Sequence, residues 1–513
     1  MSEPLRCVDE RALISGWDFS TGAVKCLVFD LSGQVVAQTR LPTDLWTDNG
    51  VSELNLLLLE GQARASTRAI AARLREAGRL NDWLAGSISA THHTAGRIDA
   101  DNNPVRRAIC WNDQTLAGYH ETGLARLGGP ERVRELIGGP WAIRYSLSHL
   151  VKDEMTLPRD DWQRTVRILQ HGSLAAGYLT GNFDQVSVSG AASTGIMDLR
   201  TNSWRREMLH AIADEQLRQW AWTQLPPIVP ADQPVGLLSE SLALEAGIDS
   251  ARRPLIFPTS DDQAAGLVGG GAVDAGQLAI ILGNSAVVNS SSDRLPAAGN
   301  LDVMRLNWGP YLWMRCYNNG ALFLDRIVGL KPDWAALEAE ARAVPAGAAG
   351  HMVLPFVYAE PSLGIESPRL QWLPTEPAPA GVRYRAALEA LAYLIALGVR
   401  EHLQAGQTIT QITVSGGIAR SDLMCQILAD VLGQPLARLH SDEGPALGAA
   451  VTALAALEAY RRRREQIADP FTTADAVRYL VRFRETVQPD MQLHSFYAQQ
   501  LQQFSLHLHE SRS

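Results

Sequence analysis

A unit of strand, polar turn and strand occurs twice in this 513-residue chain, and the repetition limits how the chain can fold. In the first unit, apolar runs at 12–17 and 23–30 flank the turn Asp18-Phe19-Ser20-Thr21-Gly22. In the second, apolar runs at 277–282 and 286–289 flank Gly283-Asn284-Ser285. Apolar runs around a short polar turn predict hairpins. Two such turns facing one cleft could hold a chain of phosphates from both sides, through hydroxyl and backbone N–H groups.

Helix and strand patterns alternate over the rest of the chain, which predicts an α/β fold. No short-period repeat is present, so a solenoid is not expected. The predicted elements are strands at 34–39, 86–90, 254–258 and 412–414, helices at 55–77, 421–431 and 444–457, a mainly helical region at 114–250, and a docked helix near the C-terminus.

The length predicts two or more domains, which we divide into an N-terminal domain at 1–255 and a C-terminal domain at 256–513. A net charge of −9 without a basic stripe argues against nucleic-acid binding. No apolar stretch approaches the ~20 residues that span a bilayer, so no membrane partner is expected. Five scattered cysteines indicate neither a zinc site nor a disulfide framework, and they fit a reducing cytoplasm.

Two groups of acidic residues are candidates for phosphate chemistry. Asp18, Thr21 and Lys25 share one hairpin and could hold phosphate oxygens and the water of a Mg²⁺ ion, although ordinary turn chemistry explains the same residues. Asp261-Asp262 follows a short strand and precedes the small-residue run after Gln263. An acid in this place suits base catalysis, and a helix N-cap explains it equally well.

Polar and glycine-rich strand ends are candidates for ligand contacts. His92-His93 could bind a polyhydroxy ligand, or could be a half-exposed loop pair. Trp111-Asn112-Asp113 would suit a sugar, and so would a tryptophan that only packs. Gly416-Gly417 permits close backbone approach to a flat ligand, although a plain strand-to-helix turn needs the same residues.

Several common catalytic motifs are absent from the sequence. There is no Gly-x-x-x-x-Gly-Lys-[Ser/Thr] loop, which excludes a P-loop nucleotide hydrolase by the usual criterion. The chain also has no Gly-x-Gly-x-x-Gly at its first helix, no Gly-x-Ser-x-Gly elbow and no His-Glu-x-x-His pair.

The order of the candidate segments resembles the FGGY family of carbohydrate kinases, and within it the xylulokinase branch. The match runs from about Ile14 to Ala455. The segments that carry it are Asp18 to Lys25, Thr91-His92-His93-Thr94, Ala108 to Asp113, Asp261 to Gly266, Gly283 to Ala286, Val414 to Ser421 and Glu443 to Ala450.

The resemblance implies a two-lobed fold of the actin and hexokinase (ribonuclease H-like) type, with duplicated domains and a deep cleft between them. It implies ATP and Mg²⁺ as cofactors, with Asp262 as the catalytic base and Asp18 on Mg²⁺ through water. It places phosphates on Ser20, Thr21, Lys25, Gly283, Asn284 and Ser285, the adenosine beside Gly416, Gly417 and Arg420, and the sugar beside His92, His93, Trp111, Asn112, Asp113 and Gln263.

The activity implied by this resemblance is transfer of a phosphoryl group from ATP to a hydroxyl of a pentulose such as D-xylulose. Another ketose or a polyol is an alternative acceptor. Ser20 and Asn284 depart from the family pattern, so a catalytically weak sugar- or nucleotide-binding regulator is a second hypothesis. A chaperone- or actin-like ATPase is a third. The sequence leaves open the assembly, with a homodimer among the alternatives, and the hydroxyl that is phosphorylated.

Overall fold

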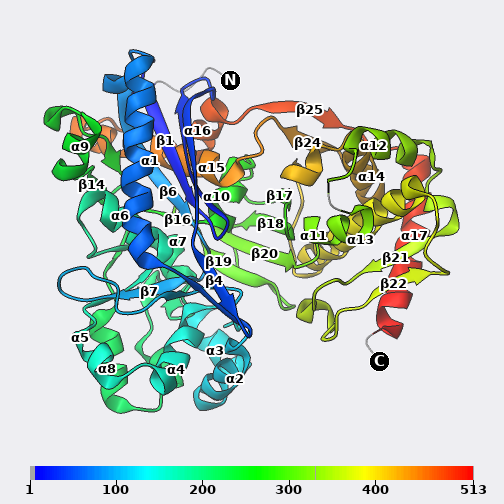
Figure 1. The fold of residues 1–513 in the computed structure, drawn as a ribbon, viewed down its shortest axis with the longest axis horizontal. Coiled ribbons are helices and arrows are strands. Elements are labelled where there is room, and N and C mark those ends of the chain that lie inside the picture. The colour runs from blue at the N-terminus through cyan, green and yellow to red at the C-terminus, as the bar shows by residue number, and fades with distance from the viewer. Residues whose placement is uncertain (1–5, 330, 512–513) are drawn as a thin grey trace.

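The computed structural model describes residues 6–329 and 331–511 and has two lobes (Figure 1). Two helices, α10 (Asp262–Gly269) and α15 (Gly444–Glu465), pack on each other where the lobes join. Although α15 comes late in the sequence, it lies against strands β1 and β6 of the N-terminal lobe. Within the described residues, no helix has the length and apolar character needed to span a membrane.

The N-terminal lobe is built on a mixed sheet in the order β14-β15-β6-β1-β2-β3, with β16 also paired to β6. Strand β1 is antiparallel to β2, with Asp18 opposite Lys25, and parallel to β6. The strands are β1 (Leu13–Phe19), β2 (Ala23–Asp30), β3 (Val35–Pro42), β6 (Trp83–Ala90), β14 (Gly236–Leu237), β15 (Leu255–Ile256) and β16 (Ser260–Asp261).

The C-terminal lobe is built on a second sheet in the order β19-β20-β18-β17-β23-β24-β25. Strand β17 is antiparallel to β18 and parallel to β23. The strands are β17 (Gln277–Leu282), β18 (Ala286–Ser292), β19 (Asp302–Arg305), β20 (Tyr311–Tyr317), β23 (Gln411–Ser415), β24 (Leu436–Leu439) and β25 (Phe483–Val487).

The two sheets share one local arrangement. A central strand, β1 or β17, is joined by a polar turn to an antiparallel neighbour on one side and lies parallel to a later strand on the other. The duplicated α/β architecture with two lobes that the sequence predicted is therefore confirmed. The domain division at residue 256 stays a prediction; β15 and β16 both pair with β6 of the first sheet.

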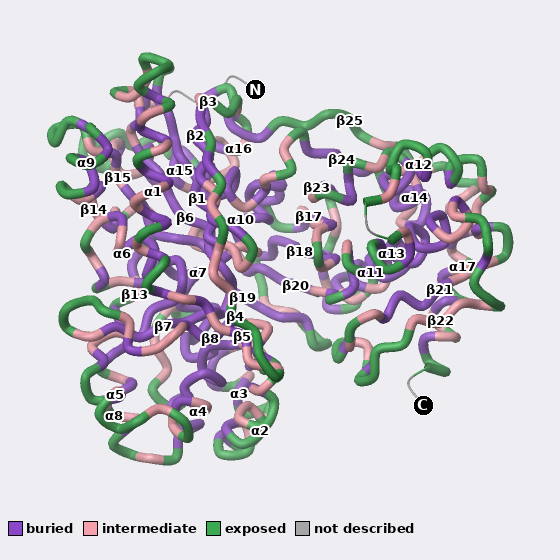
Figure 2. Tube along the Cα trace, viewed as in Figure 1, coloured by how far each residue is buried: buried purple, intermediate pink, exposed green. Residues whose placement is uncertain are grey.

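Smaller sheets and helices cover the two central sheets. Figure 2 shows buried backbone concentrated along the central strands and exposed backbone on the outer helices. The remaining strands are β4 (Leu45–Asp48), β5 (Val51–Leu54), β7 (Ala95–Ile98), β8 (Ala108–Ile109) and β9 (Arg167–Gln170) in one sheet, and the pairs β10 (Val186–Ser187) with β13 (Ile228–Val229), β11 (Met197–Asp198) with β12 (Ser203–Trp204), and β21 (Met352–Pro355) with β22 (Leu370–Leu373).

The helices follow the predicted pattern. The region 114–250 is mainly helical and the C-terminal helix is docked, as the sequence predicted. The remaining helices are α1 (Leu56–Glu76), α2 (Leu116–Leu127), α3 (Pro130–Ile137), α4 (Ser146–Thr156), α5 (Arg159–Arg164), α6 (His171–Thr180), α7 (Val188–Ala192), α8 (Glu215–Gln224), α9 (Glu240–Ala246), α11 (Ala321–Val328), α12 (Trp334–Ala343), α13 (Ala380–Gln404), α14 (Asp422–Leu432), α16 (Thr473–Leu480) and α17 (Met491–Glu510).

Glycines let the two central helices touch through their backbones. A Cβ built on Gly448 would lie 1.8 Å from the Ala265 carbonyl oxygen, and one on Gly269 would lie 1.9 Å from the Gly444 oxygen. Real Cβ atoms essentially never come so close to backbone, so only glycine fits at these two positions. The contact fixes the start of α10, which carries Asp262, relative to the start of α15.

Candidate active site

Three parallel strands of the first sheet end at one edge and bring predicted site residues together. Strand β6 pairs with β1 on one side and with β16 on the other, with Ser89 opposite both Asp18 and Ser260. The chain then continues from β6 into His92-His93 and from β16 into Asp262. Parallel strands place their carboxyl ends at a common edge, where ligands bind in open α/β sheets.

Asp18 is a buried carboxylate at this edge, 4% exposed. The Ser89 hydroxyl donates a hydrogen bond of 3.1 Å to its Oδ1. Burial raises the pKa of Asp18 to about 6, because the nearby Lys25 charge and the Ser89 hydrogen bond only partly offset the loss of hydration. The charge of Asp18 is therefore only partly stabilised by protein groups, so its carboxylate can bind a proton or a cation.

The neighbouring aspartates 261 and 262 have different surroundings. Asp261 caps α10, because its Oδ1 accepts the N–H groups of Gln263 and Ala264, and its Oδ2 accepts the Ser189 hydroxyl. Asp262 is the first residue of α10, and its Oδ1 is buried with no hydrogen-bond partner among the described residues. Burial, with the charges of Asp261 and Asp18 added, raises the pKa of Asp262 well above its ordinary value.

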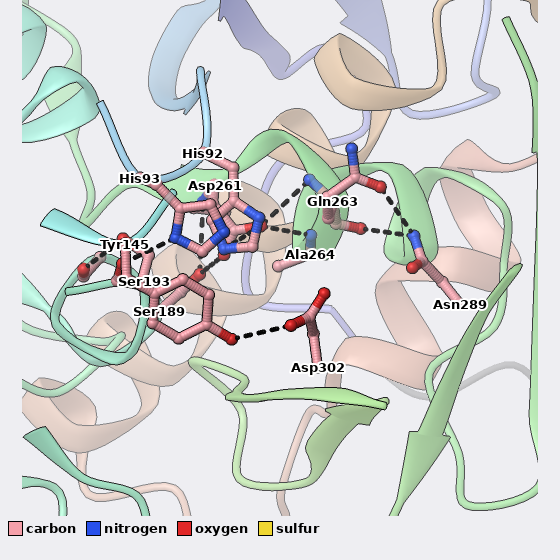
Figure 3. A network of polar contacts seen from close by, with 12 residues as sticks. His92, His93, Tyr145, Ser189, Ser193, Asp261, Gln263, Ala264, Asn289 and Asp302 are labelled. Atoms are coloured by element: carbon pink, nitrogen blue, oxygen red, sulfur yellow. Dashed lines mark hydrogen bonds and ion pairs between the residues drawn. The ribbon is translucent and has the colours of Figure 1, made fainter. Parts of the chain in front are cut away.

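His92 and His93 form a stacked pair beside these carboxylates (Figure 3). The ring centroids are 3.7 Å apart, and His93 also stacks on Tyr145 at 4.3 Å. His93 has a φ of 62° and its Nδ1 contacts the Ser193 carbonyl at 2.7 Å. The Nε2 atoms of both histidines are buried without a hydrogen-bond partner among the described residues, and that of His92 lies 3.7 Å from Oδ1 of Asp261. Burial lowers the pKa of His92 to about 4, so this imidazole is neutral at physiological pH.

The side chain of Gln263 is held toward the second lobe. Its Oε1 accepts a hydrogen bond of 3.1 Å from Asn289 in β18, as Figure 3 shows. Gln263 therefore joins Asp18, Asp262 and the two histidines in one group, which contains both candidate catalytic residues and three of the six predicted sugar contacts.

The segment 111–113 is held by other protein groups. Asp113 accepts hydrogen bonds from Lys152 at 2.9 Å and from Thr115, and Asn112 accepts one from Ser52 at 2.8 Å. Asn112 also lines a separate pocket of about 280 Å³ around the turn 47–52. Trp111 is half-buried. Asn112 and Asp113 are therefore engaged by protein groups, and His149 is an electrostatic neighbour of both His93 and Asp113.

The first phosphate turn is closed by its own serine. Ser20 Oγ donates to the Ala23 carbonyl at 2.9 Å, so this hydroxyl folds back into the turn. Gly22 is exposed, with no atom within 4 Å of a Cβ built on it, which leaves the outer face of the turn open beside Thr21.

The second phosphate turn lies next to the predicted adenosine segment. Gly416, at φ 97°, packs so closely on the end of β17 that a Cβ would lie 2.4 Å from the Leu282 carbonyl oxygen. The turn itself is supported by Gly320 at the start of α11, whose N–H donates to the Asn284 carbonyl at 3.0 Å. Gly416 is thus explained by packing, whereas Gly417 has open space at its Cβ position.

The acidic loop Asp442-Glu443, directly before α15, forms ion pairs with the first phosphate hairpin and with the predicted adenosine segment. Lys25 forms an ion pair with Glu443, and Arg420 forms one with the adjacent Asp442. The predicted nucleotide residues Lys25 and Arg420 therefore both contact this loop. Glu443 was part of the family motif but had no predicted role, because its partner lies 418 residues away in the sequence.

Two residues near the histidines were not predicted as site residues. Arg144 and Tyr145 lie just before α4, and both contact Asp302 of β19. The local sequence indicates that these two residues lie directly before a helix that starts at Ser146. It does not predict their contact with Asp302 in the second lobe.

The residues present fit a hard divalent cation. Asp18 offers carboxylate oxygens, and the Oδ1 of Asp262 lacks a protein donor. Oxygen ligands of this kind are those that Mg²⁺ prefers. His92, Asp261 and Asp262 also place one ligand atom each within 4.8 Å of the others, but both Asp261 oxygens already accept protein hydrogen bonds.

Family models match most of the chain. The N-terminal domain of the FGGY family of carbohydrate kinases matches residues 13–269, and the C-terminal domain of the same family matches residues 326–457.

Relatives among known proteins share between 22% and 29% of the aligned residues. The chain is 29% identical over 450 residues to the xylulose kinase of Escherichia coli (strain K12), covering 85% of this chain and 88% of that one. It is 27% identical over 469 residues to the glycerol kinase of Geobacter sp. (strain M21), covering 85% and 88%.

Solved structures confirm the fold. The gluconate kinase from Lactobacillus acidophilus superposes with a TM-score of 0.83 at 17% identity, covering 98% of both chains. The ligand-bound xylulose kinase from the same organism superposes with a TM-score of 0.82 at 17% identity, covering 96% of this chain and 97% of that one.

Proposed function

The chain belongs to the FGGY family of carbohydrate kinases, and from that premise we propose that it phosphorylates a pentulose such as D-xylulose. The family makes the chain an ATP-dependent sugar kinase with ATP and a sugar as its substrates. The pentulose is supported by the xylulose kinase relatives and by the histidine pair at the end of β6. The glycerol kinase relatives keep a smaller polyol as the alternative acceptor.

One observation carries the proposal. Three polar atoms, Asp262 Oδ1, His92 Nε2 and His93 Nε2, are buried at one strand edge without a hydrogen-bond partner among the described residues. A buried polar atom without a partner is costly, so such a group is expected to have a ligand during function. A hydroxyl-rich molecule supplies donors for the carboxylate oxygen and either donors or acceptors for the two neutral imidazoles.

Asp262 is proposed to act as the base in the transfer step. The acceptor hydroxyl gives its proton to Oδ1 of Asp262 as its oxygen forms a bond to the γ-phosphorus of ATP. The bond between that phosphorus and the β–γ bridging oxygen breaks, and ADP leaves. The raised pKa of Asp262 suits this role, because a stronger base accepts the proton more readily.

The two hairpin turns are proposed to hold the phosphate chain from both lobes. Thr21 and Gly22 border the open face of the first turn, and Asn284 and Ser285 form the second. Lys25 supplies positive charge on the same hairpin as Asp18. Gly417, which has open space at its Cβ position, is proposed to border the adenosine. Asp18 would hold Mg²⁺ through water, and the ion would neutralise phosphate charge when bound.

The experiment measures ADP release from ATP and Mg²⁺ with a panel of ketoses and polyols, including D-xylulose, D-ribulose and glycerol. Release that depends on D-xylulose, with the largest kcat/KM in the panel, supports the proposal. A larger kcat/KM for another acceptor corrects the substrate. Release without any sugar indicates an ATPase, and sugar binding without release indicates a regulator; either result contradicts the proposal.

A further inference from the structure

An ion pair joins the two lobes beside the proposed sugar site. The Arg144 guanidinium, just before α4, contacts Oδ2 of Asp302 in β19, and the Tyr145 hydroxyl donates to Oδ1 of the same carboxylate at 3.3 Å. The Asp302 side chain is 10% exposed and that of Arg144 is 30% exposed. Asp302 thus has both oxygens engaged by residues from the other lobe.

This pair adjoins the histidines proposed to bind the sugar. The Tyr145 ring stacks on His93, and in Figure 3 its hydroxyl points toward Asp302. Burial is the main cause that lowers the pKa of His92 and His93, and the Arg144 charge adds to it. The same charge opposes the effect of burial on Cys316 in β20, a residue beside Ser285 of the second phosphate turn. The Arg144 charge therefore acts both on the histidines of the proposed sugar site and on a residue beside the second phosphate turn.

The charges around the acceptor side favour an uncharged ligand. His92 is neutral, and the other ionisable groups close to it include Asp261 and Asp262. Arg144 is the cation that acts on both histidines, and Asp302 already neutralises it. A guanidinium without such a partner would bind a carboxylate through two parallel hydrogen bonds. With Asp302 in place, the carboxylate of a sugar acid would find Arg144 already paired and would be repelled by the nearby aspartates.

We infer that the Arg144–Asp302 pair is a specificity determinant that restricts the acceptor to uncharged ketoses and polyols and excludes aldonates. The inference rests on the proposed function, because it concerns the acceptor of that same site. Asp302 masks the Arg144 charge, and Tyr145 holds the masking carboxylate in place. An anionic acceptor binds Arg144 only if it displaces the Asp302 carboxylate, and this competition lowers its affinity relative to an uncharged acceptor.

The test compares D-xylulose with D-xylonate, which has the same number of carbons and carries a carboxylate. Asp302→Asn keeps an oxygen that can accept from Tyr145 but leaves Arg144 without its counter-ion. We expect the ratio of kcat/KM for D-xylonate to that for D-xylulose to rise about tenfold or more, one decade being about 1.4 kcal/mol. The double variant Asp302→Asn with Arg144→Met is expected to lose the gain. An unchanged ratio in the folded single variant, or a gain that persists in the double variant, overturns the inference.

Control variants separate this effect from a general change of charge. Asp232→Asn removes a carboxylate from the ion pair with Arg463, outside the proposed site, and is expected to leave the ratio unchanged. Arg144→Met alone leaves Asp302 unpaired, so discrimination against D-xylonate should increase; a decrease contradicts the inference even if Asp302→Asn does not fold.

Binding measurements keep the two proposals distinguishable. Calorimetric titration of each variant with D-xylulose and D-xylonate, without nucleotide, reports acceptor selection independently of phosphoryl transfer. If the wild type phosphorylates no sugar, the proposed function fails. A gain in D-xylonate affinity in Asp302→Asn then still supports the role of the pair, and equal affinities in wild type and variant refute it.

Discussion

At the residue scale, the contrast between Asp261 and Asp262 decides the proposed chemistry. Asp261 has three hydrogen bonds to α10 and Ser189, which stabilise its charge and fix its side chain. Asp262 has an oxygen without a partner among the described residues, and the negative charges of Asp261 and Asp18 act on it. The two adjacent carboxylates thus differ in their surroundings, because both oxygens of Asp261 accept side-chain or helix N–H hydrogen bonds and Oδ1 of Asp262 accepts none among the described residues.

Replacing the proposed base should separate these roles. We expect Asp262→Asn to lower kcat roughly 10²–10⁴-fold, the usual range for a lost general base, while the KM for ATP changes little. Asp261→Asn is the matched control, because asparagine is as good an N-cap as aspartate, and its loss should be less than about tenfold. Steady-state kinetics on both variants, with circular dichroism to verify folding, check the prediction; comparable losses in the two variants would contradict it.

The pH dependence of the reaction should follow from the same environment. A base works only when deprotonated, and burial raises the pKa of Asp262. The value of kcat/KM should therefore fall as the pH is lowered, with a midpoint well above the ordinary range of an aspartate, since this parameter reports the free enzyme. A profile that stays flat down to the pH at which ordinary aspartates titrate would show that Asp262 is not the base.

At the element scale, the contact between α10 and α15 determines where the base lies. The two helices touch through glycine backbones. Gly16 of β1 also packs on α15, where a Cβ built on it would lie 1.8 Å from the Ala446 oxygen. Side chains at these positions would push the helices apart. The position of Asp262 therefore depends on the absence of side chains at glycines far from it in the sequence.

Alanine at one of these contacts should be destabilising. We expect Gly448→Ala to lower the free energy of unfolding by about 3 kcal/mol or more, because the Cβ cannot avoid the Ala265 carbonyl without backbone movement. Gly61→Ala, at an exposed position of α1 with nothing within 4 Å, should instead raise it by roughly 0.5–1 kcal/mol through helix propensity. Urea unfolding of both variants tests the prediction, and equal effects would refute it.

The loop that follows β21 contains a buried acid that should make stability depend on pH. Glu360 accepts the Asn318 N–H at 2.7 Å and the Asn319 side chain at 3.2 Å, and burial raises its pKa from 4.5 to about 7. A raised carboxyl pKa contributes stability that is fully present below 4.5 and is lost as the pH rises through 7.

The contribution of Glu360 to the pH dependence of stability can be measured by comparing the wild type with the neutral variant Glu360→Gln. The shift corresponds to a decrease on the order of 3 kcal/mol in the free energy of unfolding between about pH 4 and pH 8. Thermal unfolding across this range should show a smaller decrease in Glu360→Gln than in the wild type. Identical pH dependence in the two proteins would mean that Glu360 does not titrate in the folded state near neutral pH.

Local patterns predicted the strands, the turns and the helix ends, because these depend on neighbours in the sequence. The helix predicted at 421–431 is α14, which Ser421 caps and Gly433 ends at φ 62°. The family motifs also predicted the residues that meet at the edge of the first sheet. Contacts such as Lys25 with Glu443, or Arg144 with Asp302, could not be predicted in this way. They join segments 418 and 158 residues apart, and no local pattern encodes which pairs meet.

At the scale of the whole molecule, the proposed site lies too deep for free access. Asp18 and His92 are 4% and 5% exposed, and Arg144 and Tyr145 connect the lobes through Asp302. We therefore expect the sugar to reach the histidines through a movement that separates the lobes at this pair. Closure over bound substrates would then exclude water, which otherwise competes as the phosphoryl acceptor.

Hydrogen exchange should detect this movement. We expect the amides of 20–23 and 283–286 to exchange more slowly with D-xylulose and a non-hydrolysable ATP analogue together than with either alone, because each turn contributes to one phosphate site. Mass spectrometry of peptides from both turns provides the measurement, with peptides from α17 as the unaffected control. Exchange at the turns that is insensitive to both ligands would argue against closure.

The backbone contact between α10 and α15 has a consequence for engineering the acceptor range. Asp262 starts one helix and Glu443 directly precedes the other, so their separation is set without any side chain that a mutagenesis library would vary. Positions 92, 93, 144 and 302 can therefore be randomised together to search for other acceptors without varying the glycines that set this separation.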